Sequence, residues 1–178
     1  PSLAKLEDNW NAVYDADDEA QIFLSWKWLS GWLSSIPGPW FILAAKERDD
    51  ADLPYVAFFP LRLQTTIEKS DVFSDIRMAG NFGADYTGIV CRPEAEHKAI
   101  PAFARIVRQM NWARLHLDDV RISERRWRLL TACFPKASFH STKVDKIIKV
   151  DGIDNSLCPY ATLPNDWNAY LDALSTNT

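Results

Sequence analysis

The tripeptide Pro37-Gly38-Pro39 separates two parts of the chain that differ in hydrophobic periodicity. Before it, apolar residues recur at helical spacing over residues 3–18 and 26–35. After it, short apolar runs over residues 40–45 and 55–64 are typical of strands. Two prolines around a glycine stop a helix. The chain is therefore expected to change from helix to sheet at this point.

The rest of the sequence mixes both element types without strict alternation. Further strands are predicted over 72–79, 86–91, 113–120, 138–142 and 146–150, and helices over 93–110, 124–134 and 166–174. Ser25, Ser123 and Asn165 are the expected N-caps of three of the helices. This order favours an α+β fold with a mixed sheet flanked by helices. No repeat or linker divides residues 1–178, so we expect a single domain.

Composition excludes several classes of protein. Hydrophobic residues make up 47% of the chain and charged residues 25%, as in ordinary globular proteins. No apolar run approaches the roughly 18–20 residues that span a bilayer, and the first residues lack a signal-peptide core. The three cysteines are widely spaced, and the three histidines do not lie at metal-ligand spacing. We expect a cytoplasmic protein with no membrane association and no metal site.

Positive charge is concentrated in residues 105–150, which hold eleven Lys/Arg against four Asp/Glu. One interpretation is binding of single-stranded nucleic acid, through Arg121, Arg125, Arg126, Arg128, Lys143, Lys146 and Lys149. The other is a set of solvated helix and strand faces. The net charge of the whole chain is −4, and the basic residues alternate with apolar ones. We therefore favour solvated faces and expect no nucleic-acid partner.

Two local motifs have both a functional and a structural interpretation. The stretch from Arg77 to Gly83 approaches the R-x-x-G-x-G/A loop that binds pyrophosphate, but Phe82 stands where a small residue is needed. Strand-like residues follow it instead of a helix, which favours a structural turn. His116 and Asp118 lie on one face of a predicted strand and resemble a base with its orienting carboxylate. No nucleophile motif accompanies them, which favours a solvent-facing pair.

The aromatic residues also allow two interpretations. Trp26, Trp28, Trp32 and Trp40 could stack sugar rings or bases, but helical spacing favours a place in the core for the helical ones. Asp85 and Tyr86 follow the glycine turn. They suit contact with a polar ligand and capping of the turn equally well.

Taken in order, one set of residues resembles the CelD-like acetyltransferases, a FemAB-related group of the GNAT superfamily. The matching residues are Trp10, Phe23-Leu24-Ser25, Trp28, Trp32, Val56-Ala57, Pro60-Leu61, Gly80, Asp85-Tyr86-Thr87, Trp112, Leu115, Leu117-Asp118, Cys158-Pro159-Tyr160, Leu163-Pro164, Trp167, Tyr170-Leu171 and Leu174-Ser175. They span nearly the whole chain. The resemblance implies a GNAT-like unit with a mixed, mostly antiparallel sheet, in which two helices precede the strands and the sheet splays where cofactor binds.

The resemblance also implies an activity. Members of the family look like two GNAT-like units in tandem, of which the second carries acyl-donor binding and catalysis. This chain is expected to be the N-terminal unit, with a C-terminal GNAT-like unit as its partner. The full protein would move an acyl group from acetyl-CoA or another acyl-CoA to an amine on a sugar or envelope precursor. The chain itself is expected to bind no acyl-CoA tightly, and no catalytic residue is assigned in it.

Two groups of site residues are expected on this basis. Asp85 and Tyr86 would contact the substrate in a cleft between the two units. Tyr160, Trp167 and Tyr170 would form the interdomain interface, through which the isolated chain would self-associate as a homodimer. The alternative from another class is a non-enzymatic module that binds glycans or a partner protein through surface aromatics.

Overall fold

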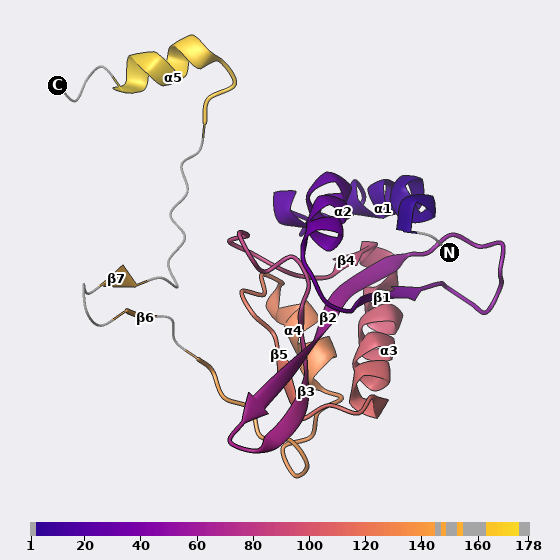
Figure 1. Cartoon of the computed structure of the whole chain (residues 1–178). Helices are drawn as coiled ribbons and strands as arrows, with labels where there is room; N and C mark the ends of the chain where they lie inside the picture. The colour runs from indigo at the N-terminus through magenta and orange to yellow at the C-terminus, as the bar shows by residue number, and fades with distance from the viewer. Residues whose placement is uncertain (1–2, 145–146, 149–152, 155–162, 175–178) are drawn as a thin grey trace. The chain divides into compact units, whose positions relative to one another are not determined.

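A computed structural model describes residues 3–144, 147–148, 153–154 and 163–174 (Figure 1). The contacts divide the chain into two compact units, residues 1–140 and 141–178, and each is described by itself. The first unit contains helices and a five-stranded mixed sheet. The expected α+β class, with a mostly antiparallel sheet, is confirmed.

Two helices open the first unit, as expected. A 3-10 turn, Leu3–Leu6, leads into α1, Glu7–Tyr14, and a second turn, Ile22–Leu24, leads into α2, Trp26–Ser35. The Ser25 side chain caps α2 by accepting a hydrogen bond from the Trp28 amide. Trp10 and Trp32 are buried, whereas Trp28 is only half-buried. The core assignment therefore holds for Trp32 and only in part for Trp28.

The sheet has the order β1-β2-β3-β5, and β4 pairs with the first two residues of β2, Ala57 and Phe58. The strands are β1 Trp40–Ala45, β2 Ala57–Glu68, β3 Asp71–Met78, β4 Val90–Cys91 and β5 Arg114–His116. All named pairs are antiparallel except β3 and β5, which run parallel. Parallel strands require a crossover, and helix α3, Glu96–Gln109, lies between β3 and β5 in the chain.

Each face of the sheet has its own core. On one face, alternate residues of the strands, such as Phe59, Leu61 and Ile76, pack with α3 and with α4, Glu124–Thr131. On the opposite face, Phe58 and Ala79 pack with Trp10 and the apolar side of α2. Helices α1 and α2 cover only one end of this second face. Figure 1 shows the long β2–β3 hairpin extending away from these two helices.

Several expected elements are shorter than predicted. Of the strand expected over 86–91, only β4 forms, and Thr87 adds an isolated parallel bridge to Val120. Residues 138–142 form no strand. The helix expected from 93 begins as a 3-10 turn, Pro93–Ala95, before α3. In the first case, the Thr87 backbone bonds to Asp119 and Arg121, after β5, whereas β4 pairs with β2.

The second unit has a short hairpin and a helix among its described residues. Strand β6, Ile147–Ile148, pairs antiparallel with β7, Ile153–Asp154, and α5 covers Trp167–Leu174. The expected cap was Asn165, but the Asp166 carboxylate accepts from the Asn168 and Ala169 amides. Within the described residues, no helix has the length and hydropathy needed to cross a membrane.

Candidate functional site

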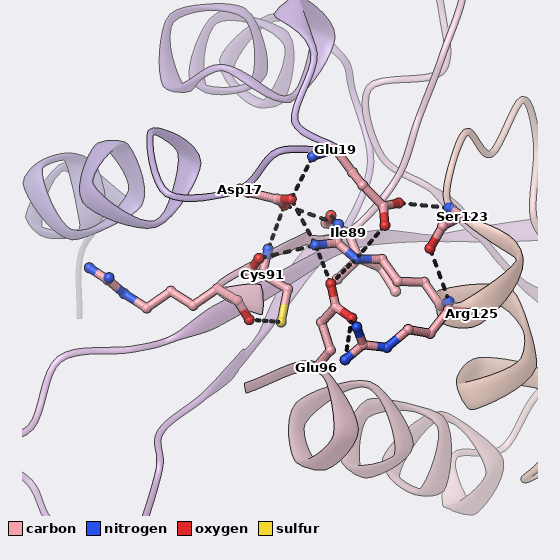
Figure 2. A network of polar contacts seen from close by, with 9 residues as sticks. Asp17, Glu19, Ile89, Cys91, Glu96, Ser123 and Arg125 are labelled. Atoms are coloured by element: carbon pink, nitrogen blue, oxygen red, sulfur yellow. Dashed lines mark hydrogen bonds and ion pairs between the residues drawn. The ribbon is translucent and has the colours of Figure 1, made fainter. Parts of the chain in front are cut away.

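Arg126, near the start of α4, is a fully buried charged group of the first unit, and Figure 2 shows the network around it, with Asp17, Glu19, Ile89, Cys91 and Glu96 labelled. Its guanidinium donates to both oxygens of Asp17, at 3.1 and 2.7 Å, and to Glu96 Oε1 at 2.8 Å. It also donates to the backbone carbonyls of Ile89 and Cys91. Glu19 lies 3.3 Å away, as an ion pair. The network ties together the segment after α1, the β4 region, α3 and α4.

This network stabilises the fold, and its groups are unsuited to catalysis. Burial alone would lower the pKa of Arg126, but the hydrogen bonds and charge of Asp17 outweigh that effect and raise it. The cation is therefore permanent, and its donors already have partners. The neighbouring thiol is equally inert, since burial raises the pKa of Cys91 to about 12.

A second polar group lies where α1 and α2 leave the sheet uncovered. Residues of alternate positions on β2, β3 and β5 share this face, because neighbouring strands are in register. We call it the polar half-face and define it by Arg62, Gln64, Thr66, Asp75, Arg77, Arg114, His116 and Asp118. Its opposite side is the core with α3 and α4. Apart from the buried Asp75, its side chains are half-buried, so each is partly exposed to solvent.

Asp75 is the buried centre of the polar half-face, with its side chain 1% exposed. It accepts from Thr66 Oγ1 at 2.8 Å and from Arg114 Nε at 3.2 Å, and His116 Nε2 lies 3.5 Å away. Burial alone would raise the pKa of Asp75, but the hydrogen bonds from Thr66 and Arg114 and the charge of Arg114 lower it overall. Asp75 is thus a stable carboxylate, bonded to Thr66 and Arg114, and the nearby His116 Nε2 is buried without a hydrogen-bond partner among the described residues.

The structure changes the expected pairing of His116. The carboxylate nearest to it is Asp75 on the neighbouring strand, whereas Asp118 forms an ion pair with Arg77 at 3.2 Å. The parallel register places His116 beside Arg77 and Arg114 beside Asp75. The His116 side chain is 28% exposed, although its Nε2 is buried.

Arg62 and Arg77 lie opposite each other on β2 and β3. Arg77 donates from Nη1 to both oxygens of Asp118. Among the described residues, Arg62 makes no ion pair with a carboxylate, and its one side-chain hydrogen bond goes to Gln64 Oε1 at 3.2 Å. Burial and the positive charge of Arg77 both lower the pKa of Arg62. This end of the polar half-face thus has two guanidinium groups and one carboxylate, Asp118, which pairs with Arg77.

The residues expected to contact substrate lie outside the polar half-face as defined here. Asp85 is exposed on the loop that follows the glycine turn. Tyr86 is half-buried, with the Arg121 guanidinium 4.8 Å from its ring centroid and the Phe23 ring centroid at 6.5 Å. Their assignment to substrate remains a prediction.

The expected interface residues lie in the second unit. Trp167 and Tyr170 are neighbours on α5, with ring centroids 5.2 Å apart, and Trp167 is 67% exposed. Tyr160 lies outside the described residues. The role of these residues in an interface remains a prediction.

The basic stretch does not form a free cationic surface on α4. Arg126 is buried in its network, Arg125 pairs with Glu96 at 3.1 Å, and Arg128 pairs with Glu124. Arg125 and Arg128 nevertheless remain largely exposed, and Lys146 and Lys149 lie outside the described residues. The absence of a nucleic-acid partner therefore stays a prediction. In the part of the chain that the structure describes, no group of three or more acidic, His or Cys side chains could hold a metal ion.

Comparisons with protein families, with curated proteins and with solved structures find no match to this chain. The interpretation of the site therefore rests on its geometry and on the resemblance described above.

Proposed function

We propose that this chain is the N-terminal, acceptor-binding domain of an acyl-CoA-dependent N-acyltransferase of GNAT type. The observation that carries the proposal is the order of elements. Two helices precede the antiparallel strands β1, β2 and β3, and the crossover helix α3 leads to β5, which is parallel to β3. This is the order that the resemblance implies for a single GNAT-like unit.

The chain itself holds no acyl-CoA in this proposal. The resembled family binds the cofactor where its sheet splays. Here, beyond the paired strands β3 and β5, the backbone of Thr87 is already hydrogen-bonded. Its amide donates to the Asp119 carbonyl, and its carbonyl accepts from the Arg121 amide. Thr87 is 1% exposed. The backbone groups that a cofactor would need at this edge are therefore already bonded to other backbone groups. This supports a division of roles between this domain and a partner domain that binds acyl-CoA.

The polar half-face is the surface we assign to the acceptor. It offers guanidinium, imidazole and amide donors on one open side of the sheet. In the complete protein, the acceptor amine would attack the thioester carbonyl. The C–N bond would form as the C–S bond breaks, and the proton lost by the amine would end on the thiolate, so that coenzyme A leaves as its thiol. The described cysteines, Cys91 and Cys133, are unpaired. We place the reaction in the cytoplasm, where acyl-CoA is made and used.

The test is an acyl-transfer assay with acetyl-CoA and amino-sugar acceptors on the complete product of the gene. We expect thiol release that depends on the acceptor, and none from residues 1–178 alone. Calorimetry of residues 1–178 with acetyl-CoA should show no binding in the micromolar range. Micromolar binding to this chain would contradict the division of roles, and a complete product without acceptor-dependent activity would contradict the proposal itself.

One observation favours a second candidate, a non-enzymatic module that binds glycans or a partner protein. Large aromatic side chains of the first unit are exposed, with Trp40 at 37%, Trp127 at 42% and Phe82 at 76%. Tryptophan rings are suitable surfaces for sugar rings. Glycan binding without any acyl transfer by the complete product would favour this candidate.

A further inference from the structure

The Arg62 guanidinium is an unusual donor group because most of its hydrogen-bonding capacity is unused. Arginine has five N–H donors. Arg62 donates one of them to Gln64, and its buried Nε has no hydrogen-bond partner in the described part of the chain. Its neighbours leave it half-buried, with Cζ 6.0 Å from the centroid of the Trp32 ring. A half-buried guanidinium without a carboxylate partner is costly unless something else pairs with it. The side chain is therefore placed to receive an anion from outside the first unit.

Four side chains on four neighbouring strands lie in one row across the sheet, because their residues are cross-strand partners. Trp40 pairs with Arg62, Arg62 with Arg77, and Arg77 with His116. These residues alternate with core residues on their strands and share the face of Ile42 and Phe58, away from α3 and α4. The row therefore runs from an exposed indole, through two guanidinium groups, to an imidazole.

Charge is unequally distributed along the polar half-face. At one end, Arg62 and Arg77 have only the Asp118 carboxylate, whereas at the other end Arg114 is bonded to both Glu68 and Asp75. The positive charge of Arg77 contributes to lowering the pKa of Arg62, which reflects repulsion between the two cations. A bound anion between them would remove this repulsion. The anion site therefore lies at the Arg62 and Arg77 end.

The shape of the donors favours phosphate over carboxylate. A phosphate monoester has three terminal oxygens that can accept from two guanidinium groups at once, whereas the two oxygens of a carboxylate match a single arginine fork. Trp40, which is 37% exposed, lies next to Arg62 in the row and offers an indole surface for a ring attached to the phosphate. A sugar ring suits this indole face and the polar side chains beside it.

We propose that the polar half-face binds a phosphorylated sugar, with its phosphate held by Arg62 and Arg77 and its ring against Trp40. His116, with Nε2 3.5 Å from Asp75, lies at the end of the row, where it would meet a polar substituent of the ligand. The assignment of this ligand as the acyl acceptor rests on the proposed function. The binding itself does not, and it is measured without acyl-CoA.

Three probes separate the parts of the proposal in calorimetric titrations of residues 1–178. They are glucosamine 6-phosphate, glucosamine and inorganic phosphate. We expect glucosamine 6-phosphate to bind most tightly, inorganic phosphate more weakly, and glucosamine not measurably. Equal affinity for inorganic phosphate and the sugar phosphate would overturn the role of Trp40 and of the sugar. No binding of either phosphate at millimolar concentration would overturn the site.

Two variants and a control locate the site. Arg62→Gln should weaken glucosamine 6-phosphate binding by roughly tenfold or more, since a lost charged hydrogen bond is worth at least about 1.4 kcal/mol. Trp40→Ala should weaken the sugar phosphate but not inorganic phosphate. Arg48→Gln is the matched control, because Arg48 is 75% exposed in the turn between β1 and β2. Unchanged binding in Arg62→Gln, with a melting temperature equal to that of the wild type, would overturn the proposal.

The two proposals fail in different ways. Suppose that Arg62→Gln loses sugar-phosphate binding and that the complete product has no acyl-transfer activity. The phosphate site is then supported, and the acyltransferase proposal is rejected. Suppose instead that the complete product transfers acyl groups equally to phosphorylated and plain amino sugars, and that Arg62→Gln leaves this activity unchanged. The phosphate site is then rejected, and the acyltransferase proposal is supported.

Discussion

Arg126 and Asp17 are 109 residues apart in the chain and form a two-point hydrogen-bonded ion pair at 3.1 and 2.7 Å in the interior of the first unit. Their side chains are 1% and 0% exposed. Through them, the segment after α1 is joined to the start of α4, and Glu96 joins α3 to the same guanidinium. This one cation therefore joins four segments of the first unit.

Replacement of Arg126 by Met should destabilise the protein by about 3–5 kcal/mol, because buried carboxylates would lose the charge that pairs with them. Urea unfolding followed by tryptophan fluorescence would measure the free energy of unfolding. The matched control is Arg125→Met, since Arg125 is 65% exposed. That change should alter the stability by no more than about 1 kcal/mol. Equal effects of the two variants would contradict the assignment of Arg126 as the central residue.

The charge of Asp75 should make the free energy of unfolding depend on pH in the acidic range. Its pKa is lowered in the folded protein from the ordinary value of 3.8, so the folded state binds its proton less readily than the unfolded state. The resulting stabilisation is fully present above that ordinary value and is lost as the pH falls through the lower, folded pKa. Asp75→Asn should therefore flatten the decline in stability at low pH.

The measurement for Asp75 is the free energy of unfolding at a series of acidic pH values. The control is Asp85→Asn, because Asp85 is exposed on its loop. If the two variants showed the same pH dependence as the wild type, the charge of Asp75 would have no part in holding the polar half-face together.

Local signals predicted α2 correctly because both of its ends are set by neighbouring residues. The Ser25 cap and the Pro37-Gly38-Pro39 stop act within one turn of the helix. In contrast, β2 extends to Glu68, beyond the predicted end at residue 64. The extra residues are polar or exposed, and they are strand only because they pair with residues 71–74. That pairing has no signature in the periodicity of either segment.

The candidate site was less accessible to sequence reasoning than the fold. His116 was singled out, but its partner Asp75 lies 41 residues earlier and meets it only through the parallel pairing of β3 with β5. Arg126 looked like one more member of a basic stretch. A residue type gives no sign of burial when its partners, Asp17 and Glu96, come from two distant segments.

Trp32 should be a core residue whose loss is costly. Its side chain is 8% exposed, and Nε1 donates to the Phe82 carbonyl at 3.1 Å. Trp32→Ala should destabilise the protein by about 3–5 kcal/mol. Trp127→Ala, at a position that is 42% exposed, should change stability by about 0.5 kcal/mol or less. An unchanged melting temperature in Trp32→Ala, together with loss of glycan binding, would instead favour the binding-module candidate.

Two glycines should respond to alanine in opposite directions. Gly31 lies inside α2, and a Cβ added there would meet no atom within 4 Å. Gly31→Ala should therefore stabilise the protein by about 0.5–1 kcal/mol, because alanine loses less conformational entropy in a helix. Gly80 has a φ of +85°, and its Cβ would lie 3.0 Å from Cδ1 of Leu29.

Gly80→Ala should destabilise the protein by about 1–3 kcal/mol, since a residue with a side chain is strained at positive φ. The contact with Leu29 adds to this strain, because the turn packs directly on α2. Thermal melting of both variants beside the wild type would measure the difference. The expected result is a raised melting temperature for Gly31→Ala and a lowered one for Gly80→Ala. A neutral Gly80→Ala would mean that the turn can move away from α2, and that Trp32 and Phe82 are not held in the arrangement described here.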